Sequence, residues 1–377
     1  MKFEMAWHLR NLTKIKKMVS PLKIFAFEYT SGGGLTDQEL PYSLMRQGEM
    51  MHRALLADLM AIPDVKVITT RDSRLPRLDL PQSALVIPVH GKFAQRFNDC
   101  VQAADAIWLV APESGGILEG LSRKVLRRKR ILLGSRPGAV RVATSKLLTV
   151  RALASVGIPV VDTYTPQETL PEKIEAWVVK PANGAGCLNT RIFSGVRKAL
   201  AWIETHGGDG YVLQPFISGQ PCSLSLICRD GWARVLSCNE QRIAVLDNQF
   251  HFLGSTVNSI TDSTGEFDRL AQKIATAIPG LWGYVGVNFI LTEKGVVVLD
   301  VNPRMTISCA GLHASIGCNP AGLVLGLLQG SADLSQPAFK PVAVSVDVGA
   351  FDIPEQRVGS SLRYNIQVNS AMPYLDS

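Results

Sequence analysis

The stretch that decides the fold is residues 283–308, which read GYVGVNFILTEKGVVVLDVNPRMTIS. It contains two apolar runs, residues 284–291 and residues 296–301. The four residues between them, TEKG at positions 292–295, are typical of a turn. The stretch therefore predicts a β-hairpin.

Polar side chains with oxygen atoms stand on both strands of this predicted hairpin. Asn288 lies on the first strand, and Asp300 and Asn302 lie on the second. Carboxylate and amide oxygens are donors that Mg²⁺ prefers, so we expect a metal site here. Arg304 follows at once and offers a planar donor fork that suits phosphate. A simpler interpretation also fits: the second strand ends before Pro303, and Asp300 caps a loop.

Length and composition describe an ordinary globular protein. The 377 residues can bury a large core and form two or three subdomains. Hydrophobic residues make up 46% and charged residues 19%, and no apolar run is long enough to span a bilayer. The seven cysteines include no CxxC pair, which indicates a reducing compartment, the cytoplasm, and no disulfide framework or zinc site.

The net charge of +7 and the pI near 9.0 suit an anionic partner. Much of the charge lies in residues 1–17 and in residues 123–130, RKVLRRKR. The basic N-terminus lacks the apolar segment of a secretory signal. Because no aromatic residues alternate with these charges, they indicate solvated surface, and we expect no nucleic-acid partner and no membrane.

The first part of the chain alternates short apolar strands with helical segments, which predicts a parallel α/β layer. The expected strands are 23–29, 65–70, 84–89, 106–111 and 131–134, and the expected helices are 47–60 and 115–126. Ligands bind at the carboxyl ends of strands in open α/β sheets. Glu28, Gly33 and Glu113 fall at such ends and are candidates for substrate binding.

The chain from about residue 144 mixes helices with antiparallel strands, which predicts an α+β arrangement for the C-terminal half. The expected helices are 145–156, 197–205 and 266–278, and the expected strands are 176–180, 188–193, 211–217, 223–228 and 233–239. Beyond residue 330 the chain is polar and less regular, apart from residues 342–348.

A glycine-rich loop, KPANGAG at residues 180–186, follows one of these strands. Glycines let the backbone fold over a phosphate chain, and Lys180 can pair with a phosphate as a point charge. No helix opens directly after the glycines, so the loop is neither a Walker A loop nor GxGxxG. An ordinary hairpin turn fits as well. Lys146, taken alone, is a solvated lysine in the first turn of a helix.

Residues 211–225, YVLQPFISGQPCSLS, combine an apolar strand with two prolines. Pro215 lacks an N–H group, which indicates an edge strand or a connector. The main chain beside Phe216 and Ile217 could bind the edge of a purine through N–H and C=O groups. An ordinary edge strand is the alternative.

Taken in order, these motifs resemble the ATP-grasp superfamily over residues 143–308. The matching pieces are Lys146 with Gly157-Ile158-Pro159, Lys180 with its loop, QPFISG, Asn239 with Gln241, and VLDVNPR. The first domain resembles the tyramine–glutamate ligase family of methanofuran biosynthesis, through FEYTSGGGL (27–35), Arg71-Asp72, APESGGIL (111–118) and LLGS (132–135). The resemblance implies an ATP-grasp fold with an N-terminal parallel α/β (pre-ATP-grasp) domain.

The resemblance also implies a role for each site residue. Lys146 and Lys180 hold the α- and β-phosphates of ATP, with Lys180 and Arg304 acting on the transferred phosphoryl group. The remaining roles are a lid over the phosphates from Asn183, Gly184, Ala185, Gly186 and Cys187; an adenine pocket from Gln214, Phe216 and Ile217; one or two Mg²⁺ ions on Asn288, Asp300 and Asn302; and substrate contacts from Glu28, Gly33, Glu113, Asn239 and Gln241.

Three positions depart from the pattern of the superfamily. Asn288 stands where an Asp is usual, Asp300 stands where a Glu is usual, and Pro221 replaces the acidic residue that holds the ribose. A neutral oxygen at position 288 implies that one Mg²⁺ binds tightly and a second binds weakly.

The resemblance implies an ATP-dependent ligase that joins a carboxylate, glutamate in particular, to an amine through an acyl phosphate. The amine is tyramine-like or tyrosine-like, or a glutamate chain, in the biosynthesis of a methanofuran-like C1 cofactor. The alternative function is a nucleotide-binding protein with weak or no catalysis. The protein could also form a homodimer. The expected domains are 1–20, a basic extension; 21–140, pre-ATP-grasp; 141–205 and 206–330, ATP-grasp; and 331–377, a C-terminal extension.

Overall fold

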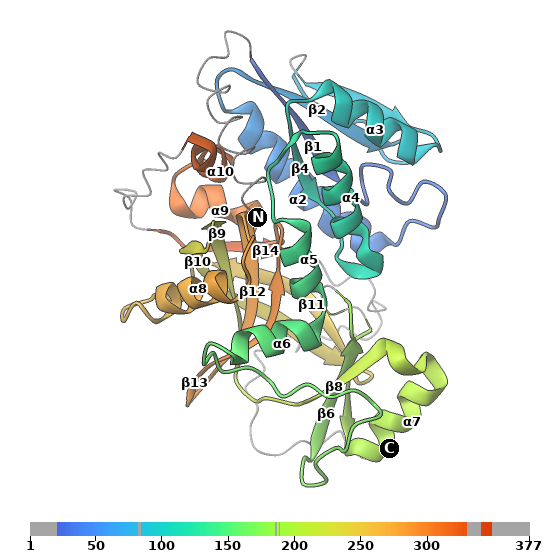
Figure 1. Cartoon of the computed structure of the whole chain (residues 1–377), viewed down its shortest axis with the longest axis vertical. Coiled ribbons are helices and arrows are strands. Elements are labelled where there is room, and N and C mark those ends of the chain that lie inside the picture. Colours follow the sequence, from blue (N-terminus) through green and yellow to red (C-terminus); the bar gives the residue numbers. More distant parts are fainter. Residues whose placement is uncertain (1–20, 82–83, 185–186, 188, 330–340, 349–377) are drawn as a thin grey trace, which may run out of the picture.

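The chain forms two β-sheets with helices packed around them (Figure 1). The computed structural model describes residues 21–81, 84–184, 187, 189–329 and 341–348. The first sheet lies at the top of the view, and the second occupies the middle and the bottom. This arrangement of a parallel sheet followed by an antiparallel one confirms the predicted fold class.

The first sheet is parallel, with five strands in the order β3-β2-β1-β4-β5. Its strands coincide with the five that the sequence predicts: β1 (Leu22–Glu28), β2 (Val65–Asp72), β3 (Leu85–Val89), β4 (Ala106–Val110) and β5 (Ile131–Leu132). From β1 the chain extends the sheet to one side with β2 and β3 and then to the other side with β4 and β5. The carboxyl ends of β1 and β4 therefore flank the crevice where open α/β sheets bind ligands.

Helices cover both faces of this sheet because side chains of β1 alternate between them. Ile24 and Ala26 pack toward α2 (Tyr42–Met60), whereas Phe25 and Phe27 pack toward α3 (Phe93–Ala103) and α4 (Ile117–Arg127). A short 3₁₀ turn, Ser114–Gly116, precedes α4. Helix α2 begins five residues earlier than predicted, and α3 is missing from the predicted elements.

The second sheet is antiparallel, and its main path runs β13-β12-β9-β10-β11-β7-β6-β8, with β14 paired to β11. The predicted hairpin is confirmed, because β12 and β13 pair and place Asn288 opposite Asp300. Strand β8 ends the path, which explains why it tolerates Pro215. The strands are β6 (Ala176–Pro181), β7 (Arg191–Ser194), β8 (Tyr211–Pro215), β9 (Gln220–Arg229), β10 (Trp232–Leu246), β11 (Gln249–Val257), β12 (Gly283–Thr292), β13 (Gly295–Asn302) and β14 (Val344–Asp347).

Within the described ranges, six α-helices accompany the second sheet. They are α5 (Pro137–Thr144), α6 (Lys146–Ala154), α7 (Val196–His206), α8 (Glu266–Ala277), α9 (Cys309–Ile316) and α10 (Pro320–Gln329), with a 3₁₀ turn at Gly208–Gly210. Helices α9 and α10, which are missing from the predicted elements, share one hydrophobic core with α2. His313 of α9 also contacts Asp58 of α2 at 2.6 Å. The two sheets are thereby joined through a common core.

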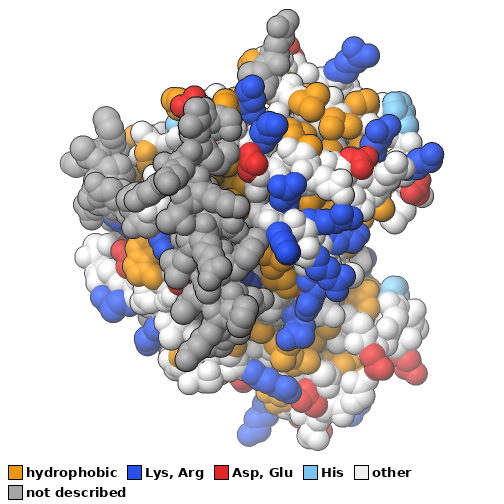
Figure 2. Space-filling model, turned by 45° about the horizontal axis from the view of Figure 1, so that its top comes forward, with side chains coloured by type: hydrophobic (Ala, Val, Ile, Leu, Met, Phe, Trp, Pro, Cys, Tyr) orange, Lys and Arg blue, Asp and Glu red, His pale blue; other side chains and the backbone are white. Residues whose placement is uncertain are grey.

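No single helix in the described ranges is long and apolar enough to cross a membrane, and α9 and α10 meet that test only as a pair bent by 85°. All seven cysteines are free. On the face shown in Figure 2, Lys and Arg side chains gather around the middle of the molecule. Positive charge is therefore unevenly distributed over this face.

Candidate active site

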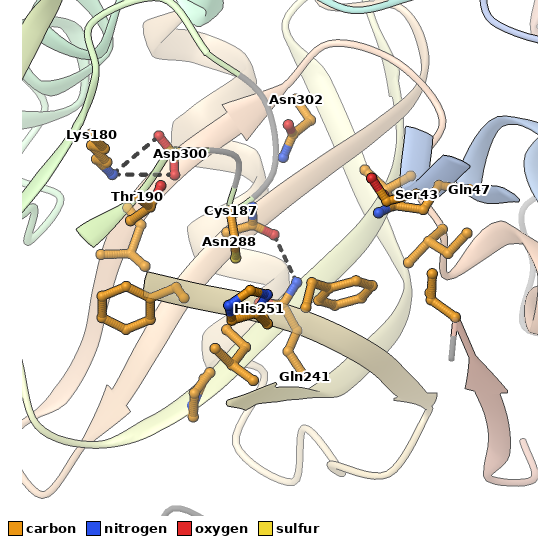
Figure 3. A pocket seen from close by; sticks show the side chains of 18 of the residues that line it. Ser43, Gln47, Lys180, Cys187, Thr190, Gln241, His251, Asn288, Asp300 and Asn302 are labelled. Atoms are coloured by element: carbon orange, nitrogen blue, oxygen red, sulfur yellow. Dashed lines mark hydrogen bonds and ion pairs between the residues drawn. The ribbon is translucent and has the colours of Figure 1, made fainter. Parts of the chain in front are cut away.

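A pocket of about 450 Å³ lies between the two sheets. One side is formed by α2 and by the carboxyl ends of β1 and β4, and the other by strands of the second sheet. Figure 3 shows Ser43 and Gln47 on one side of it, facing Lys180 and Asp300 across the pocket. The predicted site residues that line it are Glu28, Lys180, Cys187, Gln214, Phe216, Ile217, Gln241, Asn288, Asp300, Asn302 and Arg304.

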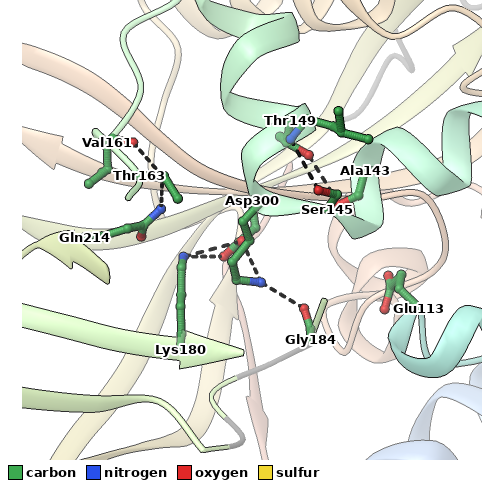
Figure 4. Close-up of polar contacts among 12 residues, drawn as sticks. Glu113, Ala143, Ser145, Thr149, Val161, Thr163, Lys180, Gly184, Gln214 and Asp300 are labelled. Carbon is green, nitrogen blue, oxygen red and sulfur yellow. Dashed lines mark hydrogen bonds and ion pairs between the residues drawn. The ribbon is translucent and has the colours of Figure 1, made fainter. Parts of the chain in front are cut away.

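Lys180 and Asp300 line the second-sheet side of this pocket, and Lys146, which does not line it, joins them in one charged cluster. Nζ of Lys146 and Nζ of Lys180 each lie 3.3 Å from a carboxylate oxygen of Asp300. Both lysine side chains are 7% exposed, so the ammonium groups are almost fully buried. The fold thus brings together side chains from α6, β6 and β13, and Figure 4 shows the contact between Lys180 and Asp300.

The electrostatics of this cluster favour an anion. Burial, helped by the nearby ammonium of Lys146 and opposed by the charge of Asp300, lowers the pKa of Lys180 to about 8. Burial tends to raise the pKa of the Asp300 carboxyl, but the charges of Lys146 and Lys180 outweigh that and hold this pKa below its usual range. Near neutral pH the cluster carries two positive charges against one negative charge. This excess of positive charge suits the phosphates of a nucleotide.

The loop after β6 is bound to the start of α6. The N–H of Lys146 donates to the carbonyl of Ala182 at 3.2 Å, and its Nζ donates to the carbonyl of Gly184 at 3.0 Å. Asn183 lies in this turn, and Cys187 lines the pocket. The predicted lid residues Ala185 and Gly186 lie outside the described residues. Lys146 therefore contacts both the loop and the carboxylate of Asp300.

An apolar slot adjoins the lysines and contains the predicted adenine residues. Phe216 and Ile217 line it together with Val178 and Leu299. The amide of Gln214 is 2% exposed and donates to Oγ1 of Thr163 at 2.7 Å. The N–H of Phe216 donates to the carbonyl of Ala176, so this N–H is not free to bind a purine edge as the sequence suggested.

Oxygen donors for a cation stand beside the lysines. Asp300, Asn288 and Asn302 all line the pocket, and Oδ1 of Asn288 accepts a hydrogen bond from Nε2 of Gln241 at 3.1 Å. Among the residues described, no group of three or more His, Cys, Asp or Glu side chains is placed to hold a metal. One carboxylate with two amides fits a Mg²⁺ that is held in part by the phosphates of a nucleotide.

Arg304 is held from the first sheet. Its Nη2 donates to Oε2 of Glu113 at 2.9 Å, and its Nη1 donates to the carbonyl of Met305 at 2.9 Å. The Glu113 side chain is 3% exposed and does not line the pocket. The carboxylate of Glu113 is therefore turned toward Arg304, and a contact of Glu113 with substrate stays a prediction.

Two further predicted substrate residues lie away from the pocket lining. Asn239 is fully buried, and its amide donates to Oγ of Ser223 and Ser225 while its oxygen accepts the N–H of Asn258. Gly33 adopts a φ of +94°, and a side chain there would meet Val89 at 2.7 Å. Both positions are buried within the fold, and their roles as substrate contacts stay predictions.

The sequence matches two family descriptions in the order that the fold shows. Residues 65–140 match the pre-ATP-grasp domain, and residues 143–308 match the ATP-grasp domain, which contains the lysines, the loop and the oxygen donors. The chain belongs to the ATP-grasp superfamily. ATP-grasp domains bind ATP with Mg²⁺, and the chain is an ATP-grasp ligase of the ADP-forming class that joins a carboxylate to an amine.

Individual relatives agree with this assignment. The chain is 27% identical over 310 residues to the tyramine–L-glutamate ligase of Methanocaldococcus jannaschii, covering 81% of this chain and 90% of that protein. An ATP-grasp superfamily protein from Archaeoglobus fulgidus superposes with a TM-score of 0.62 at 21% identity, covering 86% and 99%. The L-amino acid ligase of Bacillus licheniformis gives 0.61 at 14% identity, covering 86% and 79%. The two structural matches show the ATP-grasp fold alone.

Glu28 was predicted from the sequence, but several other polar residues that line the ATP-grasp pocket were not. Ser43 and Gln47 come from α2, and His251 comes from β11, a strand absent from the predicted elements. Thr190 and Thr306 also line the pocket. A polar residue on a helix surface resembles any solvated residue, so only the packing of α2 against the second sheet could identify these positions.

We expect Glu113 to position Arg304 in this ATP-grasp site. Glu113→Ala leaves a guanidinium that is 12% exposed without its counter-ion, so the free energy of unfolding should fall by about 3 kcal/mol. Turnover should fall about tenfold with the KM for ATP unchanged, because Arg304 would lose its orientation and not its charge. Glu113→Gln keeps an acceptor oxygen and should recover part of the rate.

The matched control is Glu119→Gln, which removes the carboxylate from a surface pair with Arg123. That pair should contribute little, so rate and stability should stay near those of the wild type. Chemical denaturation and steady-state kinetics measure both quantities. An unchanged turnover number in Glu113→Ala would show that Arg304 does not depend on Glu113.

Proposed function

We propose that this chain joins a carboxylate group of glutamate to an amine related to tyramine or tyrosine, or to a glutamate chain, with ATP as the energy source. The product would serve in the biosynthesis of a methanofuran-like C1 cofactor. The observation that carries the proposal is the continuity of the pocket. It extends from the Lys180–Asp300 cluster to α2 and the crevice of the first sheet, so a nucleotide and an acceptor can meet in one cavity.

ATP would lie with its base in the apolar slot of Phe216 and Ile217 and its phosphates at Lys146 and Lys180. Asp300, Asn302 and Asn288 would hold Mg²⁺, which offsets charge on the phosphates when it is bound. The two ammonium groups now paired with Asp300 would be shared with the nucleotide. We propose domain limits of 21–140, 141–205 and 206–330, with extensions at 1–20 and 331–377.

The reaction would proceed in two transfers. A carboxylate oxygen of glutamate attacks the γ-phosphorus of ATP, so that an acyl phosphate forms and ADP leaves. The nitrogen of the amine then attacks the acyl carbon, the C–N bond forms and phosphate leaves. Lys180 and Arg304 would offset negative charge on the transferred group, and the loop at Asn183 and Gly184 would help exclude water from the acyl phosphate.

The side chains at the other end of the pocket suit an amine with an apolar body. Met51, Phe252 and Ile307, which belong to one hydrophobic cluster, line the pocket there, and Ser43 and Gln47 add polar groups. A flat aromatic ring can bury its faces against such side chains. The similarity to a tyramine–L-glutamate ligase supports the same choice of amine.

The direct test is ADP and phosphate release by the purified protein with Mg·ATP, glutamate and a panel of amines. We expect release only with glutamate and a suitable amine, tyramine first, and a matching amide by mass spectrometry. If no amine elicits ADP while ATP still raises the melting temperature, the protein binds nucleotide without this ligase activity. The neutral donor at Asn288 is the feature that would favour that second function.

The metal site gives a separate prediction. Asn288→Asp adds a second carboxylate opposite Asp300 in the hairpin. We expect the Mg²⁺ concentration for half-maximal rate to fall about tenfold, because a charged oxygen binds a hard cation more tightly than an amide oxygen. Mn²⁺ titration in the presence of ADP, followed by electron paramagnetic resonance, should show a second bound ion. Gln241→Glu lies beside the same site and tests whether any added carboxylate suffices.

A further inference from the structure

Glu28 ends β1, at the crevice between β1 and β4. It lines the pocket with Val110 and Ala111 from the β4 side and with Gln47 and Gly48 from α2. The proposed function places the amine at this end of the pocket. The carboxylate of Glu28 is therefore an acidic group on the acceptor side, whereas Asp300 belongs to the nucleotide side.

The burial of Glu28 without a counter-ion is unusual in this chain. Its side chain is 3% exposed, and its carboxylate accepts the N–H of Thr30 at 3.1 Å and the N–H of Ser31 at 2.6 Å. Within the described ranges, no basic side chain forms an ion pair with it. The other buried carboxylates of those ranges each have a basic partner: Asp58 with His313, Asp72 with Arg74, and Glu113 with Arg304.

Helix α2 has a glycine, Gly48, at the point where it approaches this carboxylate. A Cβ atom at Gly48 would lie 2.6 Å from Oε2 and 2.7 Å from Oε1 of Glu28. Glycine inside a helix costs about 1 kcal/mol relative to alanine. Gly48 nevertheless stands in the middle of α2, where it leaves the carboxylate its space. The position of this carboxylate is thus fixed from both the strand and the helix.

A buried carboxylate without a counter-ion is costly unless a ligand supplies the charge. Burial raises the pKa of Glu28 above its usual value, against the hydrogen bonds from Ser31 and Thr30. On α2, Arg46 lines the same pocket, and His52 contacts Ser31 and has a pKa that burial lowers to about 4. Neither forms an ion pair with Glu28. An ammonium group is the ligand chemistry that fits.

We propose that Glu28 binds the ammonium group of the acceptor amine and accepts its proton during amide formation. This inference rests on the proposed ligase function. One N–H bond of the ammonium breaks and its proton passes to the carboxylate. The freed lone pair forms the C–N bond with the acyl carbon, the C–O bond to phosphate breaks, and a second N–H proton passes from the new amide nitrogen to the leaving phosphate. The protonated Glu28 then returns its proton to solvent as the products leave.

The test separates the two half-reactions. Wild type and Glu28→Gln are each assayed with Mg·ATP and glutamate, once with tyramine and once with hydroxylamine. Tyramine must lose a proton before it attacks, whereas hydroxylamine is already neutral at pH 7 and traps the acyl phosphate as a hydroxamate. We expect the kcat/KM for tyramine to fall about 100-fold in Glu28→Gln. Hydroxamate formation should stay within about twofold of the wild type.

Raising the pH gives a second readout. In Glu28→Gln the rate with tyramine should rise by up to about tenfold per pH unit, because free amine replaces the missing proton acceptor. Glu293→Gln, an exposed position in the turn of the hairpin, is the matched control and should leave both assays unchanged. Gly48→Ala displaces the carboxylate without altering it and should reproduce the selective loss with tyramine. Gly48→Ala replaces Glu28→Gln as the test variant if Glu28→Gln does not fold.

The outcomes are distinguishable. If the wild type forms neither hydroxamate nor amide, the proposed ligase function fails. If the wild type is active and Glu28→Gln loses hydroxamate as well as amide formation while it still binds ADP, Glu28 serves the carboxylate substrate, and the inference is overturned. Equal rates with tyramine in wild type and Glu28→Gln overturn it too.

Discussion

Asp300→Asn should lower the rate of ADP formation by at least about 10³-fold. Asp300 is the carboxylate between Lys146 and Lys180, at 3.3 Å from each. It would also be the charged donor to Mg²⁺, since Asn288 and Asn302 supply neutral oxygens only. The isosteric amide keeps the shape of the side chain and removes the charge that both functions need.

The same substitution should destabilise the protein before nucleotide binds. Lys146 and Lys180 are 7% exposed and would face each other without the intervening negative charge. Breaking such a buried ion pair costs about 3 kcal/mol of unfolding free energy. Saturating ADP should recover part of this loss, because its phosphates replace the carboxylate as counter-charge. Chemical denaturation with and without ADP measures both effects.

Asp79→Asn is the control, because Asp79 is exposed and lies outside the pocket lining. It should match the wild type in rate and in stability. Retained ADP formation in Asp300→Asn would contradict our assignment of Asp300 as the metal-binding carboxylate. A variant that is inactive but equally stable without ADP would instead show that the two lysines do not depend on Asp300.

The hairpin of β12 and β13 could be predicted because its signals are local. Two apolar runs around a four-residue turn determine the pairing, and the pairing places Asn288 opposite Asp300. The parallel first sheet could also be predicted from the sequence, since each of its strands is a short apolar run between polar segments. These predictions depend on the local pattern of apolar and polar residues, and not on which other elements pack against each strand.

The cluster at Asp300 could be predicted only through the resemblance to a family. Lys180 and Asp300 are 120 positions apart in the chain, and β6 is separated from β13 by most of the second sheet. No periodicity relates such positions. A lysine at the start of a helix and a lysine at the end of a strand give no physical signal of their common partner.

Two predicted substrate residues have partners that the sequence alone does not reveal. Asn239 was a plausible substrate residue as a polar side chain on a strand, but it is satisfied by Ser223, Ser225 and Asn258 inside the sheet. Glu113 was correctly placed at a strand end, but it contacts Arg304. The sequence indicates which residues are polar, whereas their partners depend on contacts between elements that are distant in the chain.

Lys180→Met should weaken ADP binding by about 10- to 100-fold at pH 7, which is the usual contribution of a charge-assisted hydrogen bond. Methionine preserves most of the side-chain volume and removes the ammonium. Lys146 and Arg304 remain, so binding should weaken without being abolished. Isothermal titration calorimetry measures the affinity. The control is Lys198→Met, an exposed lysine of α7 that should leave ADP binding unchanged.

The affinity of the wild type for ADP should also fall as the pH rises above 8. Burial lowers the pKa of Lys180 to about 8 in the free protein, so its ammonium is charged below that pH and neutral above it. The phosphates bind the charged form, which raises this pKa in the complex, and binding above pH 8 must therefore take up a proton. The affinity should fall by up to about tenfold per pH unit, and Lys180→Met should lack this dependence. Calorimetry in buffers of different ionisation enthalpy measures the proton uptake, and a constant wild-type affinity from pH 7 to about pH 9.5 would show that binding does not need the charge of Lys180.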